Sequence, residues 1–346
     1  MTDKLRFGIV GAGGIAQTYA QAFKNCETAQ LVAIADTRID AARALAEEMK
    51  CPSFVSYEAM AEEVKLDAVA VCTPPVTHPE ICVFFLERKV HVLCEKPFSI
   101  DSESARSMCR AATVNGVKLT MASKFRYVAE VVRAKSMVES GMFGDVILFE
   151  NSFTSRVDMA KRWNSNKLIS GGGVLIDNGA HSVDLMRYFL GPLAGVQIVE
   201  GKRSQGLEVE ETVHIFVRSL KGVMGNIDLS WSINKEQENY ISIYGTQGTV
   251  KIGWRESKYR TSNSGWVIFG QGYDKVQAFN HQIVNFSKAI KGTEQLLITA
   301  DDALASVEVI EAAYSALQNN QWIPVGRDQR ANGSASPLVI DSGKVS

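Results

Sequence analysis

The residues best suited to proton transfer are an aspartate and a histidine four positions apart. Asp177 and His181 lie in a segment, 171–181, that opens with three glycines and continues in a helical pattern. Because residues four apart share one face of a helix, both side chains are predicted to point the same way. A carboxylate beside an imidazole can hold one tautomer and stabilise the protonated ring, as a base acting on a hydroxyl requires. The residues alone leave open a satisfied core histidine and a helix-capping aspartate.

A lysine in the tripeptide Glu95-Lys96-Pro97 is the second candidate for chemistry. The tripeptide follows the apolar run 91–94, which is typical of a buried strand. Lys96 is therefore expected at the carboxyl edge of a sheet, where ligands of such folds bind. Its ammonium can donate to a substrate oxygen, and a cis proline after it would fix the turn that aims it. The alternative is a surface lysine at a strand end.

A glycine-rich turn after the first predicted strand indicates a dinucleotide site. Gly11, Gly13 and Ala16 follow the order G-x-G-x-x-A, which permits a tight turn, a close pyrophosphate and close helix packing. Asp36 ends the second predicted strand, where a carboxylate accepts hydrogen bonds from the ribose hydroxyls. Its charge repels the extra phosphate of NADP and so favours NAD, although Arg38 can partly compensate for this repulsion. The alternative is a turn without a ligand. The predicted cofactor contacts are Gly11, Gly13, Gly14, Ile15, Ala16, Asp36, Thr37, Arg38, Thr73, Pro74, Pro75, His78, Glu95 and Lys96.

Four of these contacts follow the predicted strand 68–72. Thr73, Pro74, Pro75 and His78 come directly after it, at the carboxyl edge that also carries Lys96. Thr73 and His78 are expected to line the cofactor. His78 is equally compatible with a plain residue at the start of a helix.

The elements that must position these residues fall into two groups. Up to about Ala122, short apolar runs alternate with segments of helical period, which predicts a doubly wound parallel sheet. Beyond a helical segment at 129–140, longer alternating runs predict a large, mostly antiparallel sheet, and two more helical segments follow at 275–290 and 300–318. Thr299 and Asp302 introduce the last of these with the spacing of a capping box. The predicted strands are 5–10, 31–35, 68–72, 91–94, 118–122, 146–154, 212–220, 223–231, 240–244 and 249–252.

The predicted fold class is therefore α/β, with an N-terminal Rossmann domain and a C-terminal α+β domain. We place the Rossmann domain at 1–123 and the α+β domain, for substrate binding and oligomerisation, at 124–330. Within the second domain the helix 299–318 is expected to pack back on the first, and 331–346 is expected to form a tail.

Composition places the ligand among small molecules. The 346 residues are 46% hydrophobic and 22% charged with a formal net charge of -1, so no overall field attracts nucleic acid or a membrane. The N-terminus lacks the pattern of a signal peptide, which predicts a cytoplasmic protein. None of the six cysteines forms a C-x-x-C pair, which favours buried thiols. No metal is expected, because Asp177 and His181 lack an evident third ligand.

The combined motifs resemble the Gfo/Idh/MocA family, named for glucose-fructose oxidoreductase, inositol dehydrogenase and a rhizopine catabolism protein. The resemblance implies that Lys96 is the active-site lysine, and that Asp177 and His181 are the catalytic aspartate and histidine. It also implies reversible hydride transfer between NAD, or alternatively NADP, and a hydroxyl or keto carbon of a sugar, an inositol or a sugar derivative. The motifs span nearly the whole chain, through 11–16, 73–75, 95–97, 125–127, 171–181 and 300–318.

Polar and aromatic residues around the predicted cleft are candidates for substrate binding. Polyols are held by charged and amide hydrogen bonds and by an aromatic face, whereas the alternative is a polar crossover with a packing tryptophan. An uncovered sheet face would favour a homodimer or homotetramer. Two rival functions stay open: an NAD-dependent glycosidase that uses transient oxidation, and a non-catalytic regulatory protein that binds the cofactor. The predicted substrate contacts are Lys124, Arg126, Tyr127, Arg156, Trp163 and Asn178, with Asp158, Arg162 and Asn164 beside them.

Overall fold

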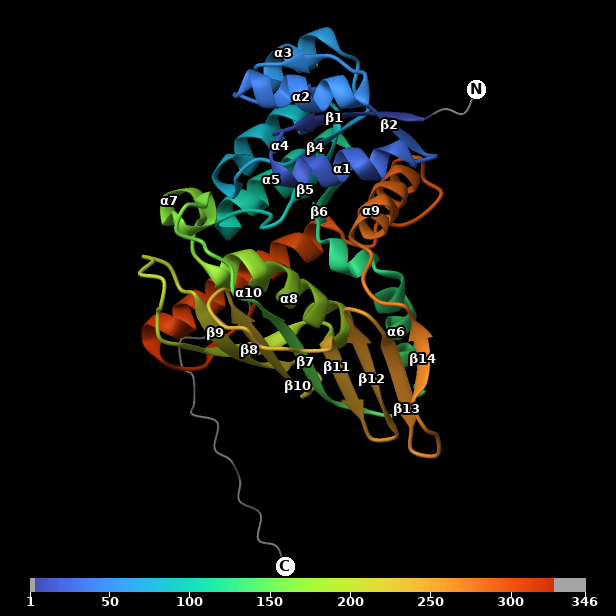
Figure 1. Cartoon of the computed structure of the whole chain (residues 1–346), viewed down its shortest axis with the longest axis vertical. Coiled ribbons are helices and arrows are strands. Elements are labelled where there is room, and N and C mark those ends of the chain that lie inside the picture. The colour runs from blue at the N-terminus through green and yellow to red at the C-terminus, as the bar shows by residue number, and fades with distance from the viewer. Residues whose placement is uncertain (1–3, 327–346) are drawn as a thin grey trace, which may run out of the picture.

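A parallel six-stranded sheet forms the upper half of the computed structural model, which describes residues 4–326 (Figure 1). Its strand order is β3-β2-β1-β4-β5-β6, and every neighbouring pair is parallel. The order reverses at β1, so the carboxyl ends of β1 and β4 border the crevice where such sheets bind ligands. The strands are β1 (Leu5–Val10), β2 (Ala29–Ala35), β3 (Ser53–Phe54), β4 (Ala68–Val71), β5 (His91–Glu95) and β6 (Leu119–Ala122).

Helices cover both faces of this sheet. Local signals define their ends: Asp101 caps α5 by accepting the backbone N–H of Ser104 at 2.7 Å, and Gly116 ends it with a left-handed φ of 67°. The helices are α1 (Gly14–Lys24), α2 (Ile39–Met49), α3 (Tyr57–Glu63), α4 (His78–Glu87) and α5 (Ser102–Asn115), with 3₁₀ turns at Pro75–Thr77 and Lys124–Tyr127.

A second sheet of nine strands forms the lower half, in the order β14-β13-β12-β11-β7-β10-β9-β8-β15. It is antiparallel except where β10 runs parallel to β7. The predicted fold class is confirmed, because a parallel Rossmann sheet precedes a large, mostly antiparallel one. The strands are β7 (Val146–Thr154), β8 (Leu193–Glu200), β9 (Thr212–Ser219), β10 (Met224–Ser230), β11 (Asn239–Gly245), β12 (Gly248–Gly253), β13 (Ser257–Thr261), β14 (Val267–Gly270) and β15 (Ile323–Pro324).

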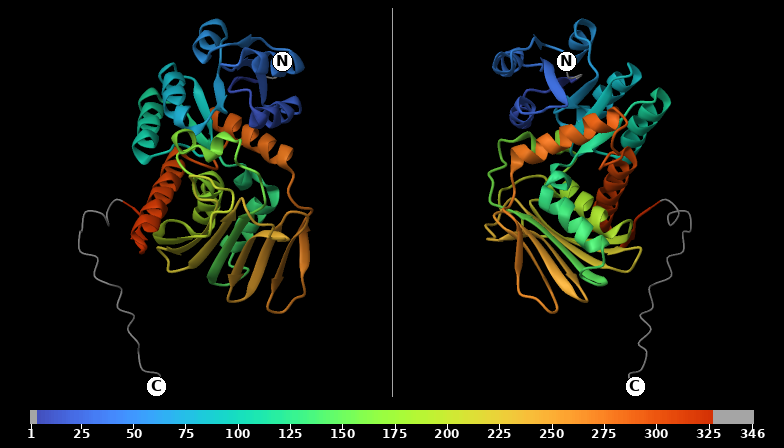
Figure 2. Two further views of the ribbon diagram at one scale, coloured as in Figure 1. Left: turned by 60° about the vertical axis from the view of Figure 1, so that its left-hand side comes forward. Right: turned by 90° about the vertical axis from the view of Figure 1, so that its right-hand side faces the viewer.

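Helices cover one face of the second sheet and leave the other face open (Figures 1 and 2). The helix α8 lies between this sheet and the Rossmann domain, with α6 and α10 beside it. The open face carries exposed apolar side chains, including Ile147, Phe216 and Met224. The helices of this half are α6 (Ala129–Glu139), α7 (Lys167–Ser170), α8 (Val174–Leu190), α9 (Lys275–Ile290) and α10 (Ala300–Asn319), with a 3₁₀ turn at Trp163–Ser165.

The last two helices return to the first domain. Phe279 and Ile283 of α9 pack in the same hydrophobic cluster as Phe7 of β1. On α10, Glu308 pairs with Arg106 of α5 at 2.7 Å, and Glu311 accepts the N–H of Ser102 at 2.7 Å. The predicted capping box of Thr299 and Asp302 is also present. A boundary at 123 therefore separates the two sheets, but residues from both sides of it share the hydrophobic clusters of the first domain. The predicted tail at 331–346 lies outside the described residues.

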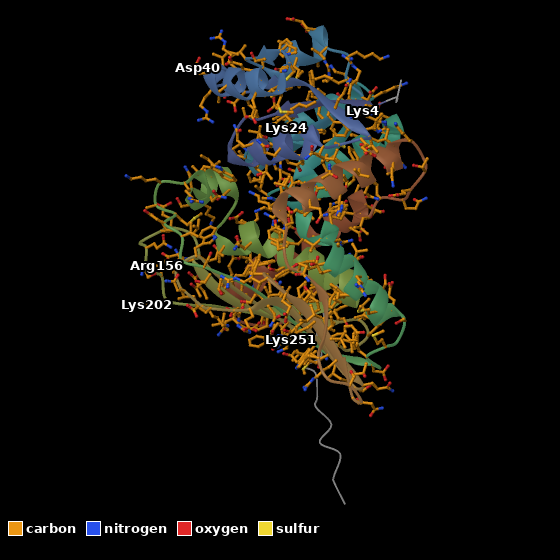
Figure 3. All side chains as sticks on the ribbon, turned by 45° about the vertical axis from the view of Figure 1, so that its right-hand side comes forward. Lys4, Lys24, Asp40, Arg156, Lys202 and Lys251 are labelled. Carbon is orange, nitrogen blue, oxygen red and sulfur yellow. The ribbon has the colours of Figure 1, made fainter. Side chains whose placement is uncertain are left out.

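Charged side chains are spread over the surface of both halves, as Figure 3 shows for Lys24 and Asp40 above and Lys202 and Lys251 below. In the part of the chain that the structure describes, no helix is long and apolar enough to cross a bilayer. The six cysteines are free thiols, four of them buried.

Candidate active site

A salt bridge between the two domains marks the centre of the candidate site. The Lys96 Nζ lies 2.5 Å from the Asp177 Oδ1 and 3.2 Å from the Asp177 backbone oxygen. Lys96 follows the last residue of β5, and its peptide bond to Pro97 is cis. Asp177 lies in the first turn of α8, in the second domain. The two residues predicted from separate motifs therefore meet where the two domains contact each other.

His181 lies on the same helix but contacts a different partner. Its ring is buried, its Nδ1 is 3.2 Å from the Ser123 Oγ, and its Nε2 has no hydrogen-bond partner. The ring forms a T-shaped contact with Phe125, with centroids 5.0 Å apart. Burial lowers the pKa of His181 well below its usual value, and the charges of Lys96 and Lys124 lower it further. Asp177 thus holds Lys96, and Ser123 takes the contact to His181 that the sequence assigned to Asp177.

Lys124 brings a second ammonium group to this cluster. It lies over the rings of Phe125 and Phe279, at 5.2 and 5.9 Å from their centroids. Burial, together with repulsion from Lys96, lowers the pKa of Lys124 to about 8. Lys124 is therefore a cation that can lose its proton within the range in which most enzymes work.

The buried Glu95 holds the turn on which Lys96 lies. Its carboxylate accepts the Tyr19 hydroxyl at 3.0 Å and the backbone N–H of Lys96 at 3.1 Å. Burial raises the pKa of Glu95, whereas the charges of Lys96 and Lys124 oppose that rise. Glu95 thus anchors the turn that carries Lys96, and Tyr19 ties that turn to α1.

The glycine turn after β1 has the shape that a dinucleotide requires. Gly11 has a φ of 94°, and a Cβ there would come within 2.8 Å of the Cys72 backbone oxygen. Gly13 is the N-cap of α1, and a Cβ there would meet no atom within 4 Å, so a phosphate can approach its backbone. Ala16 is fully buried against the sheet. The residues of this turn therefore fit the pyrophosphate of NAD.

Asp36 is held in place beside that turn. One carboxylate oxygen accepts the N–H of Ala12 and the other that of Arg38, both at 2.7 Å. An ionised carboxylate has further lone pairs, so ribose hydroxyls can still donate to it. The Arg38 side chain is exposed and lies 3.7 Å from Asp36, and Thr37 beside it is also exposed.

His78 is buried in the fold, where both nitrogens of its ring face backbone oxygens. Its Nδ1 lies 3.0 Å from the oxygen of Pro97, and its Nε2 lies 2.9 Å from that of Thr73. His78 is also the first residue of α4, which agrees with the alternative prediction of a plain residue at the start of a helix. It thereby joins the loop that carries Thr73 to the turn that carries Lys96.

Two of the predicted substrate contacts are used inside the protein. Arg126 is buried and forms a two-pronged ion pair with Asp184, at 2.7 and 3.0 Å, and it also donates to the backbone oxygen of Leu297. Tyr127 is buried within the Rossmann core. These positions correct the expected roles of both residues, because their side chains join elements of the fold.

The other predicted substrate contacts lie further out. Arg156 and Asp158 line an open hollow of about 510 Å³ with Gln205 and Ser232, and Figure 3 shows Arg156 at the edge of the second domain. Trp163 is 42% exposed. Asn178 lies on α8 beside Asp177, and its backbone oxygen accepts the Ser182 hydroxyl at 3.4 Å. Among the described residues, no hydrogen bond or ion pair links these side chains to Lys96 or His181.

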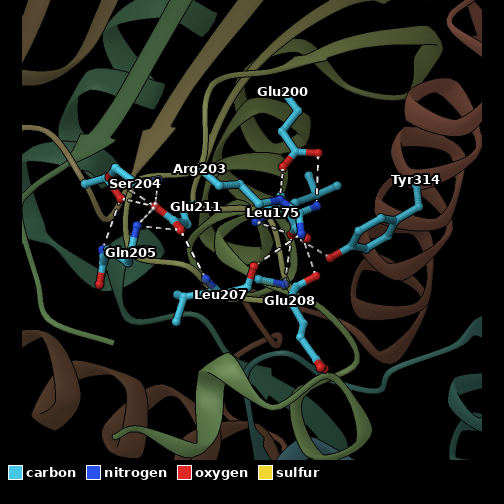
Figure 4. A network of polar contacts seen from close by, with 12 residues as sticks. Leu175, Glu200, Arg203, Ser204, Gln205, Leu207, Glu208, Glu211 and Tyr314 are labelled. Atoms are coloured by element: carbon cyan, nitrogen blue, oxygen red, sulfur yellow. Dashed lines mark hydrogen bonds and ion pairs between the residues drawn. The ribbon is translucent and has the colours of Figure 1, made fainter. Parts of the chain in front are cut away.

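The start of α8 is fixed by a residue that sequence reasoning missed. The Glu210 carboxylate accepts the N–H groups of Gly173 and Leu175, at 2.8 and 3.1 Å, and the Tyr314 hydroxyl at 2.8 Å (Figure 4). A Cβ on Gly172 would lie 1.8 Å from the Tyr314 hydroxyl oxygen. The glycine run was thus a signal for this close approach, and Glu210 sets the start of the helix that carries Asp177 and His181.

The adjacent Glu211 anchors a neighbouring loop instead. Its carboxylate accepts the backbone N–H groups of Ser204 and Gln205, at 2.8 and 2.9 Å, and the Ser232 hydroxyl at 2.7 Å (Figure 4). Two consecutive glutamates therefore connect the start of α8 and the rim of the Arg156 hollow to the same strand end.

Comparisons with known proteins agree with this geometry. Residues 5–123 match the model of an oxidoreductase family with an NAD-binding Rossmann fold, and residues 131–251 match the GFO/IDH/MocA C-terminal domain. An inositol 2-dehydrogenase of Rhizobium meliloti (strain 1021) is 24% identical over 93% of this chain and 99% of its own. A D-glucoside 3-dehydrogenase of Escherichia coli (strain K12) is 35% identical over 55% of each chain. The structure of a levoglucosan dehydrogenase with NADH and levoglucosan superposes with a TM-score of 0.87, at 20% identity, and covers 94% of this chain and all of that one.

The two family matches together span most of the chain and both of its sheets. They also include the turn, the lysine and the helix on which the site is built. The chain belongs to the Gfo/Idh/MocA family, and it is an NAD(P)-dependent oxidoreductase with an NAD-binding Rossmann domain.

Proposed function

We propose that the protein oxidises a secondary hydroxyl of a sugar, an inositol or a sugar derivative with NAD, and that it also catalyses the reverse reduction. The observation that carries the proposal is the Lys96 to Asp177 ion pair between the two domains, together with the unpartnered Nε2 of His181 one helical turn from Asp177. The relatives support the substrate class, since one is named an inositol 2-dehydrogenase and another a D-glucoside 3-dehydrogenase.

The residues of this chain have separate tasks in that reaction. When bound, the nicotinamide supplies the hydride acceptor, and the glycine turn and Asp36 are the groups that would hold its dinucleotide. His181 accepts the hydroxyl proton at Nε2, because that nitrogen is buried and the low pKa of the ring keeps it neutral. Lys96, held by Asp177, donates a hydrogen bond to the same substrate oxygen and stabilises negative charge that develops there.

Lys124 and the outer residues complete the proposed substrate site. Lys124 lies close enough to Lys96 for their charges to interact, so it can donate to a neighbouring oxygen of the polyol. Arg156, Trp163 and Asn178 are proposed to contact parts of the substrate further from the reacting carbon. We also propose a cytoplasmic homodimer or homotetramer that buries the open sheet face, where Ile147, Phe216 and Met224 are exposed.

A screen of purified protein against sugars, inositols, glycosides and sugar nucleotides, with NAD and NADP in parallel, tests the proposal. We expect NADH to accumulate with at least one polyol and to require NAD rather than NADP. Lys96→Met should abolish that signal while NADH binding, measured by fluorescence, persists. Glycoside cleavage without net NADH would instead identify a hydrolase, and cofactor binding without turnover of any polyol would identify a non-catalytic protein.

The choice between NAD and NADP has its own variant. Asp36→Ala removes the carboxylate that we expect to bind the ribose hydroxyls and leaves Arg38 in place. We expect this variant to lose affinity for NADH and to gain affinity for NADPH. An unchanged ratio of the two dissociation constants would contradict the proposed role of Asp36.

A further inference from the structure

A chain of buried polar groups lies behind the catalytic histidine. The Nδ1 of His181 is 3.2 Å from the Ser123 Oγ, and the Ser123 hydroxyl is near enough to the Asp184 carboxylate to lower its pKa. Asp184 in turn is paired with Arg126 at 2.7 Å. All four side chains are at most 5% exposed. The chain therefore runs from the imidazole to a buried ion pair without reaching solvent.

The direction of the hydrogen bonds in this chain follows from counting protons. The hydroxyl of Ser123 has one proton, whereas the carboxylate of Asp184 can only accept when it is ionised. Burial raises the pKa of Asp184, whereas the two-pronged contact with Arg126 opposes that rise and favours the ionised carboxylate, because an Arg guanidinium does not give up its charge. The Ser123 proton is therefore directed to Asp184, and the Ser123 oxygen is left to accept a proton from the Nδ1 of His181.

Two further observations favour the same arrangement. The positive charges of Lys96 and Lys124 disfavour a protonated imidazole, so the ring is neutral and carries a single N–H. The ring cannot easily turn over, because Phe125 forms a T-shaped contact with it at 5.0 Å and Phe153 lies at 6.4 Å. One nitrogen is thus committed to Ser123, and the other has no hydrogen-bond partner in the fold.

We propose that Ser123 and Asp184 are positioning residues that hold His181 with its proton on Nδ1, so that Nε2 presents a lone pair to the substrate hydroxyl. The role in catalysis rests on the proposed dehydrogenase activity, whereas the tautomer itself does not. In oxidation, the substrate O–H bond breaks and its proton bonds to Nε2. The C–H bond of the carbon that bears this hydroxyl also breaks, its hydride goes to the nicotinamide, and the carbon becomes a carbonyl. Ser123 and Asp184 keep their own protonation states throughout.

The backbone places these residues so that they act together. Ser123 and Arg126 lie on one 3₁₀ turn, in which the Arg126 N–H donates to the Ser123 backbone oxygen at 3.1 Å. His181 and Asp184 lie three residues apart on α8, so one turn of the first segment faces one turn of the second. Neither Ser123 nor Asp184 touches the reacting atoms.

Isotope-edited nitrogen NMR of the full-length protein with labelled histidines tests the tautomer directly. His181→Gln assigns the resonances, and the wild-type ring is expected to show a protonated Nδ1 and a bare Nε2 at pH 7. Ser123→Ala is expected to shift the population toward a protonated Nε2 and to lower kcat for the polyol by roughly 10²-fold, as a wrong tautomer does in other His-dependent enzymes. The Kd for NADH is expected to stay unchanged.

Matched variants separate positioning from simple loss of stability. Ser182→Ala removes a buried hydroxyl next to His181 that bonds only within α8, and it is expected to leave the tautomer and kcat unchanged. Asp184→Asn, studied if Ser123→Ala is poorly folded, keeps the shape of the carboxylate but removes its charge, and it is expected to shift the tautomer the same way.

A protonated Nε2 in the wild type, or a Ser123→Ala protein with the wild-type tautomer and kcat, would overturn the proposal. A wild-type protein with the expected tautomer that oxidises no polyol would refute the proposed function and support the assigned tautomer.

Discussion

Two buried histidines, His78 and His181, differ in how many of their ring nitrogens lie within hydrogen-bonding distance of an oxygen atom of the protein. Both rings are at most 5% exposed, and burial lowers the pKa of each. The ring of His78 has a backbone oxygen within 3.0 Å of each nitrogen, whereas His181 has one contact to Ser123 and an unpartnered Nε2. Burial alone thus does not distinguish a structural histidine from a catalytic one. The distinguishing property is a ring nitrogen, the Nε2 of His181, that has no hydrogen-bond partner in the fold.

Replacing His181 is expected to have the largest effect on activity. His181→Gln removes the base at Nε2, so kcat for the polyol should fall by about 10³-fold, within the range typical of general-base catalysis. The Kd for NADH should change little, and the melting temperature should fall only by what the Ser123 contact and the packing on Phe125 contribute. A variant with more than a tenth of the wild-type kcat would remove the distinction between the two histidines.

Replacing His78 should instead affect stability. The neutral ring of His78 has one N–H and donates to only one of the backbone oxygens of Thr73 and Pro97. His78→Phe removes that hydrogen bond, and one unsatisfied buried acceptor costs about 1–3 kcal/mol. Urea unfolding should show a loss of about 2 kcal/mol or more. The kcat per folded molecule should fall far less than in His181→Gln, and a comparable fall would give His78 a direct part in the reaction.

The pH dependence of stability should show both histidines. Each is neutral in the fold because its pKa is lowered, whereas in the unfolded chain it binds a proton below about pH 6.5. Their contribution to stability is therefore complete above about pH 6.5 and is lost as the pH falls toward the folded pKa, by at most about 1.4 kcal/mol per pH unit for each ring. The free energy of unfolding of the wild type, of His78→Phe and of His181→Gln, measured between pH 7 and 5, gives the contribution of each histidine to this pH dependence. Equal slopes in all three proteins would contradict this account.

Lys124 is a charged neighbour that lowers the pKa of His181 but has no such effect on His78. Since the pKa of Lys124 is about 8, kcat/KM for the polyol should fall above that pH if its ammonium binds the substrate. Lys124→Arg stays charged and should lose this alkaline limb, whereas Lys124→Met should be about tenfold less active below pH 8, the value of one charged hydrogen bond. NMR titration should also show a higher pKa for His181, but not for His78, in Lys124→Met.

The smallest effect is expected at the start of α8, which carries His181 but not His78. Tyr314→Phe removes one hydrogen bond to Glu210 and should cost about 1 kcal/mol of stability, with a severalfold loss of kcat. Tyr244→Phe is the matched control, because its hydroxyl also donates to a glutamate, Glu150 at 3.0 Å, on the second sheet. An equal loss of kcat in both variants would show that the effect is not specific to α8.

Sequence reasoning predicted the elements whose patterns are local. The glycine turn, the capping box of α10 and the five alternating runs predicted for the second sheet depend on neighbouring residues, and they lie where they were expected, the runs as β7 and β9 to β12. The strand β8 was not predicted, because its alternation of buried and exposed residues is interrupted. The strands β13 and β14 lack a regular alternation of buried and exposed residues, because they lie at the edge of the sheet. They were therefore not predicted.

The partners within the site were harder to predict. The spacing of Asp177 and His181 indicated one helix face, but Asp177 pairs with a lysine 81 positions away and His181 contacts a serine 58 positions away. Ser123 and Glu210 have no local pattern that marks them, since serine and glutamate are common in loops and on surfaces. Arg126 was assigned to the substrate from its place in a motif, and only its contact with Asp184 shows that the fold uses its charge.

The return of α9 and α10 to the Rossmann domain has a consequence for how the chain folds during synthesis. Phe279 and Ile283 complete one core of that domain, and Ile298, Ala303 and Val307 pack in the other. A ribosome that has released only the first 123 residues has therefore exposed a domain whose apolar faces still lack their covers. The N-terminal half therefore gains its last core contacts only after almost the whole chain has emerged, and until then part of its apolar surface stays exposed.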